Sequence, residues 1–268
     1  MRPLKIPAAI SSIIDKSLSE EKMIASTLME YARISGTVPE VSIVIPAYNE
    51  EQNIVPTLYS LCSNLTLRSV EIIVVDNNSI DRTAELAKAC GITCAFQPIQ
   101  GITVTRNLGL SMARGKYVLN ADADSIYPKD WIELMVNPLE DSSVALTYGR
   151  FAHIPTTSTG RSFYFFYEYL AEFSRWINKK IKDEAVNVYG FNSGFRRLQG
   201  LEVDGFNHPE GTNEDGWLAV KLRNSGFGRL NLVKDPKAMV WTTDRRIQMD
   251  GGILTGTIKR LKRVILKR

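Results

Sequence analysis

The chain has 268 residues, of which 44% are hydrophobic and 23% charged, and its formal net charge is +4. These fractions are typical of a folded globular protein and exclude an intrinsically disordered chain. A chain of this length buries a core large enough to fold without disulfides, and its three cysteines cannot form a full disulfide framework. We see neither a signal-peptide pattern nor the roughly 20 apolar residues that cross a bilayer. We therefore expect a cytoplasmic protein without a nucleic-acid partner.

The first element in chain order is expected to be helical. Over residues 8–35, Ile, Leu and Tyr recur at roughly helical spacing between serines and charged residues, which predicts a helical appendage over residues 1–39. At Val41 the pattern changes to an apolar, β-branched run that ends at Pro46. We therefore expect the main domain to begin at residue 40.

Strand-like and helix-like runs then alternate as far as residue 150. The expected strands cover residues 41–45, 70–76, 92–97, 117–121 and 144–148, and the expected helices cover 51–64, 82–90 and 104–114. Because the strands are continuously apolar and are separated by helices, they predict a mostly parallel sheet with helices on both faces. The predicted fold class is therefore α/β.

The second half of the main domain loses this alternation. Residues 163–176 are rich in aromatic side chains and predict an amphipathic helix. Its rings are expected to pack in the core or at an interface, although the flank of a binding groove would have the same composition. A further helix is expected from Trp217 to its stop at Gly226.

The final segment, residues 247–268, is strongly basic. Six Lys and Arg side chains occupy the last ten positions, interleaved with Ile, Leu and Val. This pattern predicts a basic helical tail that lies on an anionic membrane surface. A solvated helix that packs its apolar side on the protein explains the composition equally well, so both interpretations stay open.

Polar residues follow the first two expected strands. The segment PAYNEE begins at Pro46, and the segment DNNSIDRT begins at Asp76. Ligands of an open parallel sheet bind beyond the carboxyl ends of its strands, so both segments are candidates for a binding site. Each segment alone also has the usual composition of a turn followed by a helix cap.

Two acidic pairs carry a stronger chemical signal. Asp122 and Asp124 follow the strand expected at 117–121, and alternate carboxylates at a strand end can converge on a hard cation such as Mg²⁺ or Mn²⁺. A cation there would bridge the phosphates of a diphosphate leaving group. Glu214 and Asp215 precede a helix, where they are either ordinary partners of the helix dipole or a general base for an acceptor hydroxyl.

Taken together, these motifs resemble a known family. The segments VSIVIPAYNEEQNI, VVDNNSIDRT, GITVTRNLGL, VLNADADS, GFNSGFRR and NEDGWLAVKLRNSGF, in this order, resemble the inverting glycosyltransferases of family 2. The resemblance covers residues 41–246, about three quarters of the chain. It implies a GT-A fold over residues 40–246, with a Rossmann-like nucleotide-sugar-binding half at 40–150 and an acceptor-binding half at 151–246.

The resemblance also implies roles for individual residues. Those that match the family's donor-binding positions are Pro46, Ala47, Tyr48, Glu50, Asp76, Arg106, Asp122 and Asn192. Ser193, next to Asn192, would contact a hydroxyl of the donor sugar or the acceptor. Within this set Asp76 would accept a hydrogen bond from the nucleobase, and Arg106 would lie near the donor phosphates. The expected metal ligands are Asp122 and Asp124, with Asp124 the more direct of the two. Asp215 matches the catalytic base and Glu214 its partner.

One position departs from the family pattern. Many members carry a histidine after the final strand as a further ligand of the metal or the diphosphate, whereas this chain has Asp244, Arg245 and Arg246 there. Either Asp244 replaces that ligand, or the two arginines bind the diphosphate directly as charge-assisted donors.

The expected function is transfer of a sugar, with inversion, from a nucleotide-diphosphate donor to a hydroxyl of a glycan or lipid-linked acceptor. A UDP-sugar is the preferred donor and GDP-mannose the alternative, and the family suggests cell-surface polysaccharide or glycolipid synthesis at the inner face of the membrane. A catalytically silent binding protein of the same fold remains a rival. A phosphatase is disfavoured because the acidic pair follows a late strand. A nucleotidyltransferase is disfavoured because the first strand lacks a following glycine-rich loop.

Overall fold

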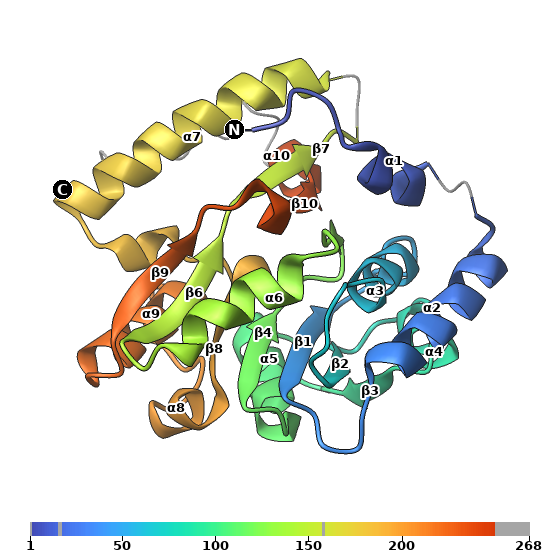
Figure 1. Cartoon of the computed structure of the whole chain (residues 1–268), viewed down its shortest axis with the longest axis horizontal. Helices are drawn as coiled ribbons and strands as arrows, with labels where there is room; N and C mark the ends of the chain where they lie inside the picture. Colours follow the sequence, from blue (N-terminus) through green and yellow to red (C-terminus); the bar gives the residue numbers. More distant parts are fainter. Residues whose placement is uncertain (1, 16–17, 157–158, 250–268) are drawn as a thin grey trace.

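The structure is a computed structural model, and it describes residues 2–15, 18–156 and 159–249. Within these residues a seven-stranded mixed sheet in the order β3-β2-β1-β4-β8-β6-β9 forms the centre, with a three-stranded sheet in the order β5-β10-β7 as a second layer (Figure 1). The large sheet contains β1 (Val41–Ala47), β2 (Val70–Asp76), β3 (Thr93–Phe96), β4 (Tyr117–Asn120), β6 (Val144–Gly149), β8 (Ser193–Arg196) and β9 (Arg229–Val233). The small sheet contains β5 (Ser125–Ile126), β7 (Phe151–Ile154) and β10 (Val240–Thr243).

The parallel half of the large sheet is built from almost wholly apolar strands. β1 pairs in parallel with β2, from Val41 opposite Val70 to Ala47 opposite Asp76, and pairs in parallel with β4 on its other edge. Every residue of β2 is buried. Apolar strands of this kind need helices on both faces. The predicted α/β class with a mostly parallel sheet is confirmed.

Helices cover the two faces as strand geometry requires. Ile43 shares a buried core with α3 (Ile54–Cys62), whereas the next residue, Val44, packs in a second core with Leu110 of α5 (Ile102–Met112). Successive side chains of a strand point to opposite faces, so β1 belongs to both cores. The carboxyl ends of β1, β2 and β4 are therefore held rigidly between two helical layers.

The two N-terminal helices pack on different parts of the molecule. Ile10 of the first lies in a core with residues of the small sheet, and the second packs on the parallel half. They are α1 (Ala8–Ile14) and α2 (Glu20–Ile34), and the side chain of Ser19 caps α2 by accepting a backbone hydrogen bond. Met23 and Ile34 of α2 are buried in the core that contains α3. The described part of the predicted appendage is thus helical, and α2 lies directly on the main domain. One more helix, α4 (Thr83–Ala89), lies between β2 and β3 in the chain.

The sequence does not predict β8, which reverses the sheet direction. β8 runs antiparallel between β4 and β6, so its first residue, Ser193, lies opposite Asn120, the last residue of β4. A Cβ on Gly194 would lie 2.4 Å from the side chain of Leu119, so the close pairing of these strands requires glycine there. The antiparallel course brings the segment before β8 to the carboxyl edge of the parallel strands.

The rest of the described chain is mainly helical. Its α-helices are α6 (Trp131–Val136), α7 (Arg161–Ile181), α8 (Arg197–Glu202), α9 (Glu214–Asn224) and α10 (Arg245–Met249). Its 3₁₀ helices are η1 (Asn137–Glu140), η2 (Glu184–Asn187), η3 (Gly190–Asn192) and η4 (Pro236–Ala238). α7 contains the predicted aromatic helix and runs along one edge of the molecule (Figure 1). The expectation of core packing is wrong for Phe166, Phe173 and Trp176, whose exposed fractions are 68%, 61% and 59%.

Three further expectations concern the termini, the membrane and the cysteines. The predicted basic tail lies outside the described residues, except for its first three positions at the end of α10. Among the helices that the structure describes, none is both long and apolar enough to cross a membrane. Cys62, Cys90 and Cys94 are all free thiols.

Candidate active site

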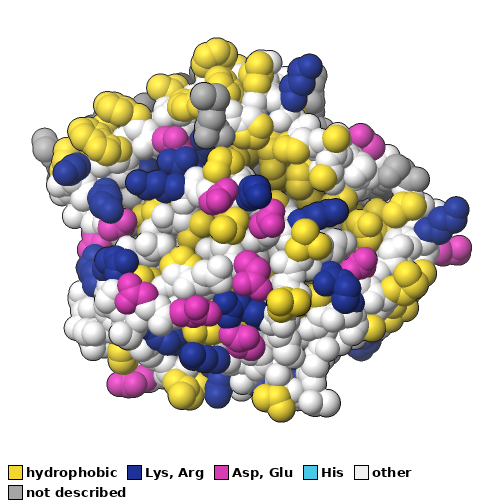
Figure 2. Space-filling view, viewed as in Figure 1, with side chains coloured by type: hydrophobic (Ala, Val, Ile, Leu, Met, Phe, Trp, Pro, Cys, Tyr) yellow, Lys and Arg dark blue, Asp and Glu magenta, His cyan; other side chains and the backbone are white. Residues whose placement is uncertain are grey.

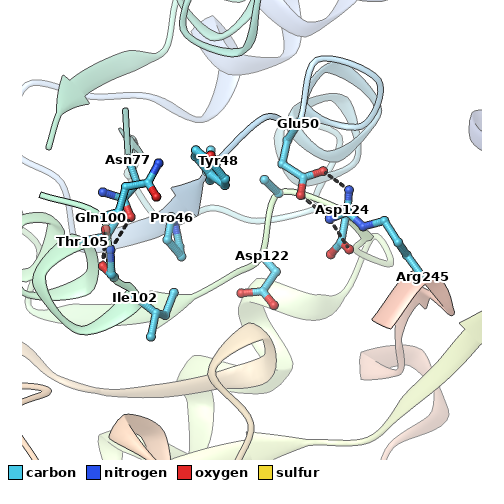
Figure 3. Close-up of a pocket in the computed structure, with 13 residues that line it drawn as sticks. Pro46, Tyr48, Glu50, Asn77, Gln100, Ile102, Thr105, Asp122, Asp124 and Arg245 are labelled. Atoms are coloured by element: carbon cyan, nitrogen blue, oxygen red, sulfur yellow. Dashed lines mark hydrogen bonds and ion pairs between the residues drawn. The ribbon is translucent and has the colours of Figure 1, made fainter. Parts of the chain in front are cut away.

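A cavity of about 350 Å³ opens at the carboxyl ends of β1 and β4 (Figure 3). The predicted site residues that line it are Pro46, Ala47, Tyr48, Glu50, Asp122 and Asp124. The lining residues that sequence reasoning did not assign to the donor are Asn77, Gln100, Gly101, Ile102, Ala123 and Thr105. Most of these lie inside the strand-end and GITVTRNLGL motifs, so whole motifs predicted the cavity better than single positions did. Arg245 completes the lining.

The loops after β1 and β2 are tied to one another beside the cavity. The backbone N–H of Asn49 donates to Ser79 Oγ at 2.9 Å, and the backbone N–H of Glu50 donates to Thr83 Oγ1 at 2.7 Å. Asn49 has a φ of 54°, a left-handed conformation that asparagine tolerates better than most residues. The turn and cap roles foreseen for these motifs are therefore real, and they fix the position of the lining residues.

The acidic side of the cavity holds three carboxylates and one arginine. Burial raises the pKa of Asp124 to about 6, and the negative charges of Asp122 and Glu50 add to the effect. Arg245 opposes it, since its guanidinium bonds both carboxylate oxygens of Glu50 and lies 3.3 Å from Asp124 Oδ2. Thr243 Oγ1 also donates to Asp124, at 3.0 Å. The site thus carries more negative charge than Arg245 neutralises.

Asp244 does not face this cavity, so the hypothesis that it replaces the family histidine is wrong. Its Oδ1 accepts the backbone N–H of Thr156 at 2.9 Å, and its Oδ2 accepts hydrogen bonds from the Tyr164 hydroxyl and the Gln248 amide. The carboxylate is fully buried among these donors on the side of α7. Arg245, the next residue, is the one that reaches the cavity.

A second group of charges lies around the buried guanidinium of Arg106, on α5. Its Nη2 is 3.1 Å from Asp122 Oδ1, and its Nε is 3.6 Å from Asp215 Oδ1 and 3.9 Å from Glu214 Oε1. Asp122 therefore belongs to both the cavity and this cluster. Residues predicted separately from the β4 end and from the start of α9 are brought together by Arg106. A Cβ on Gly190 would lie 2.2 Å from Arg106 Nη2 and 2.4 Å from Asp215 Oδ1, so this packing requires glycine.

The Asp215 carboxylate is almost completely buried. Only 8% of the residue is exposed, and its Oδ1 has no hydrogen-bond partner among the described residues. Burial raises the pKa of Asp215 to about 6, Arg106 opposes the shift, and Glu214 and Asp122 reinforce it. The carboxylate is still largely ionised at pH 7, as a base must be.

Helix capping does not account for Asp215. The cap of α9 is Asn213, whose side chain accepts the backbone N–H of Gly216 at 3.0 Å. The sequence left open whether the acidic pair serves the helix or a reaction. Asp215 lies in the first turn of α9, where it can still partner the helix dipole, and it also faces Arg106.

Besides Arg106, three residues that were expected to contact the donor or its sugar lie outside the cavity lining. The Asn192 amide is buried, where it accepts a hydrogen bond from Trp131 Nε1 at 2.9 Å and donates to the Arg150 carbonyl at 2.8 Å, so its groups are already used within the protein. Ser193 Oγ accepts from Asn120 Nδ2 at 3.1 Å. Asp76 is also buried, but its Oδ1 has no partner among the described residues, and the next residue lines the cavity.

The acidic pair fits a divalent cation only together with a phosphate ligand. Among the described residues, no group of three His, Cys, Asp or Glu side chains converges in a way that could hold a metal ion. Mg²⁺ in nucleotide sites is usually bound by one or two carboxylates plus substrate phosphates and water. Asp122 and Asp124 both line the cavity and could supply the carboxylates.

Comparison with known proteins identifies the family. The sequence profile described as glycosyl transferase family 2 matches residues 42–198, more than half of the chain. The chain belongs to this family. The uncharacterized glycosyltransferase YibD of Escherichia coli is 34% identical to this family 2 glycosyltransferase over 108 residues, which cover 38% of this chain and 31% of YibD. Glycosyltransferase AglE of Haloferax volcanii is 31% identical over 125 residues, which cover 43% of this chain and 40% of AglE. The chain thus spans less than half the length of these curated relatives.

Solved structures of other proteins show a similar fold. The mannosyltransferase PcManGT from Pyrobaculum calidifontis, in complex with GDP-Man and Mn²⁺, has a TM-score of 0.56 at 20% identity, over 87% of this chain and 66% of that one. S. aureus TarS 1-349, in complex with UDP-GlcNAc, has a TM-score of 0.58 at 18% identity, over 76% and 58%. The predicted GT-A fold is confirmed.

Proposed function

We propose that the protein transfers a sugar from a nucleotide-diphosphate donor, a UDP-sugar in preference to GDP-mannose, to a hydroxyl group, with inversion at the sugar carbon. The observation that carries the proposal is the meeting of Asp122 and Asp215 at Arg106, beside a cavity lined by the predicted donor residues. The similar structures of TarS and PcManGT hold UDP-GlcNAc and GDP-Man, which supports a nucleotide-sugar ligand for the cavity.

In this proposal the residues around the cavity hold the donor. Tyr48 and Asn77 flank the nucleoside, and the unpartnered Oδ1 of Asp76 is an acceptor suited to the N–H of a uracil or guanine ring. Asp124 and Asp122 would hold Mg²⁺ or Mn²⁺, which when bound neutralises charge on the leaving diphosphate. Arg245 adds a fixed positive charge at the same end of the cavity.

Asp215 is the proposed base. It takes the proton of the acceptor hydroxyl as the oxygen forms its bond to the sugar carbon, while the bond from that carbon to the diphosphate breaks. Attack opposite the leaving group inverts the configuration and needs no covalent intermediate. Arg106 holds Asp215 in place and favours its ionised form, so burial raises the pKa without removing the charge at neutral pH.

The acceptor and the cellular setting belong to the same proposal. A glycan or lipid-linked acceptor, assembled into cell-surface polysaccharide or glycolipid at the inner face of the membrane, suits a family 2 enzyme. The basic tail would hold the protein on an anionic membrane surface. Deletion of residues 259–268 should then weaken binding to anionic liposomes, and equal binding without them would contradict the role of the tail.

Calorimetric titration with UDP and GDP, each with and without Mn²⁺, tests the donor and the metal together. We expect UDP to bind, and Mn²⁺ to strengthen its binding at least about tenfold, because the diphosphate completes the metal shell. Asp124→Ala should remove the metal effect, whereas Glu202→Ala, a change of an exposed acid on α8, should keep it. Tighter binding of GDP would move the donor to GDP-mannose. Absence of binding to either nucleotide would favour the catalytically silent protein.

A further inference from the structure

Helix α7 is amphipathic in the reverse sense, with its charged side chains toward the protein and its apolar ones toward solvent. On its inner side Glu168 is buried, and its Oε2 lies 3.1 Å from Arg2 Nη1 and 2.9 Å from Arg161 Nη2. Its other oxygen accepts the backbone N–H of His153 at 2.7 Å. Further along the same side, Glu172 pairs with Arg150 at 3.0 Å. Ion pairs and hydrogen bonds, rather than an apolar stripe, therefore join α7 to the domain.

The outer side of α7 is a continuous apolar surface, which we call the α7 stripe. Its members are exposed aromatic and aliphatic side chains: Phe163, Phe166, Tyr169, Leu170, Phe173, Trp176 and Ile181. From Phe163 to Trp176 they recur at a spacing of three and four residues, which places them on one face of the helix. Leu170 has an exposed fraction of 70% and Phe166 one of 68%. Figure 2 shows hydrophobic side chains along this ridge.

Positive charge borders the α7 stripe. A cavity of about 640 Å³ between α7 and β9 is lined by six Lys and Arg side chains against two carboxylates, Glu172 and Glu184. These carboxylates already pair with Arg150 and Lys179, whereas Lys180 and Lys234 have no carboxylate partner among the described residues. Figure 2 shows the dark blue side chains directly beside the apolar ridge.

We propose that the α7 stripe docks the protein on the surface of an anionic lipid bilayer, with α7 lying in the plane of the interface. Phe, Trp and Leu on one face and Lys and Arg at the border are the composition of helices that bind in this way. The rings of Tyr169 and Trp176 suit the headgroup level, where aromatic side chains are enriched. This inference concerns a surface away from the cavity, and it does not depend on the proposed reaction.

The charges favour a bilayer over the two other occupants that could cover the stripe. A second copy packed face to face would bring the same lysines against each other. The chain's own tail carries six Lys and Arg residues in its last ten positions, so it would also meet like charge beside α7. The described chain ends at Met249, next to Gln248, whose amide donates to Tyr164 of α7 at 3.2 Å. This contact lies on the inner side of α7, where Tyr164 is fully buried. An anionic membrane would attract the positive charge of the tail and that of the border of the α7 stripe alike.

Vesicle cosedimentation of the full chain, without donor or metal, tests the proposal. The double variant Leu170→Asp, Phe173→Asp changes two exposed side chains of the stripe. Its matched control is Val38→Asp, Leu67→Asp, at positions that are exposed elsewhere to 82% and 104%. We expect wild type and control to bind vesicles that contain phosphatidylglycerol more strongly than vesicles of phosphatidylcholine alone. On the vesicles with phosphatidylglycerol, the α7 variant should bind at least about tenfold more weakly than wild type.

Three outcomes would overturn the proposal. The first is equal binding of the α7 variant and the control, because the tail or another surface would then carry all the affinity. The second is a wild type that binds neither vesicle. The third is a wild-type dimer, seen by sedimentation, that the α7 variant dissociates, because the stripe would then be a contact between copies. Circular dichroism and UDP titration of each variant report whether it is folded, separately from vesicle binding.

Discussion

Among the residues that the structure describes, a buried cluster of arginine and carboxylate lies at the candidate active site and another lies under α7, and their charge balance is opposite. At the active site, one guanidinium, that of Arg106, faces three carboxylates at 3.1 to 3.9 Å. Under α7, one carboxylate, that of Glu168, lies between the guanidinium groups of Arg2 and Arg161 at 3.1 and 2.9 Å. The first cluster has a surplus of negative charge, and the second has enough positive charge for its carboxylate.

The pKa shifts follow this difference. Burial raises the pKa of Asp215 to about 6. The positive charge of Arg106, which also faces Asp122 and Glu214, does not offset the desolvation of Asp215 and the repulsion from these two acids. Burial also opposes the charge of Glu168, but hydrogen bonds from His153 and Arg161 outweigh it and lower the pKa below the usual range. A raised carboxyl pKa beside a cavity marks a group that can exchange a proton, whereas a lowered one marks a pair that joins two parts of the fold.

The largest expected effect comes from removing the negative charge of the Asp215 carboxylate. We expect Asp215→Asn to lower kcat by about 10³-fold, the scale of a lost general base.

The same substitution should not lower the free energy of unfolding. Because the folded protein holds this proton more tightly than the unfolded chain, the free energy of unfolding falls as pH rises from the ordinary pKa of 3.8 to about 6, and above pH 6 the charge destabilises the folded state. Steady-state kinetics and urea unfolding at pH 7.5 measure both quantities.

The control for this change is Asp183→Asn. Asp183 also faces an arginine on α9, Arg223 at 2.8 Å, but both side chains are about one-third exposed. Surface pairs of this kind contribute little, so kcat should change by less than about twofold. Equal kcat values for the two variants would remove Asp215 from the mechanism.

The second expected effect comes from breaking the balanced cluster. Glu168→Gln leaves Arg161 and part of Arg2 buried without a counter-charge, so we expect the free energy of unfolding to fall by about 3 kcal/mol. Activity per folded molecule should stay near that of wild type, the reverse of the Asp215 result. The exposed pair of Glu20 with Arg82 provides the control, and Glu20→Gln should cost less than about 0.5 kcal/mol. An unchanged stability for Glu168→Gln would mean that water, not protein, solvates this cluster.

The smallest expected effect is a pH dependence of the wild type. If Asp215 must be ionised, kcat/KM should fall about tenfold for each pH unit below about 6, and should level off above that pH. Glu168 should leave no such step, because its lowered pKa keeps it ionised over the same range. The profile is measured with saturating metal, and the residual activity of Asp215→Asn should lack the slope. A rate that stays level well below pH 6 would assign the base to another group.

Sequence reasoning predicted the parallel half of the fold and one side of the site. The strands ending at Ala47, Asp76 and Asn120 are almost wholly apolar, so their positions and the meeting of Tyr48, Glu50 and the acidic pair follow from the local pattern. The direction of β8 does not follow, because a four-residue strand with one glycine carries no sign of its partners. The burial of Asp215 is hidden for a similar reason, since it depends on Arg106, which is distant in sequence.

The sequence also could not predict which face of α7 packs against the protein, for a different reason. Helical periodicity shows that one face is apolar and the other charged, but it does not say which face meets the protein. Here the charged face is inside, because Arg2 and Arg150 approach it from distant parts of the chain. The same limit applies to Asp244 and Arg245. Both carry charge after the last strand, and only the structure shows that the arginine lies at the cavity.

Those two neighbouring residues connect regions that otherwise have little in common. Asp244 is held by Tyr164 of α7, and Arg245 is held by Glu50 at the cavity. Consecutive Cα atoms are about 3.8 Å apart across a rigid peptide unit, so a single peptide unit, just before α10, separates the residue held by α7 from the residue held at the cavity. We expect a displacement of the first turns of α7 to move Arg245, whose guanidinium lies 3.3 Å from Asp124. A movement of the outer helix is therefore expected to reach the donor cavity through one peptide unit.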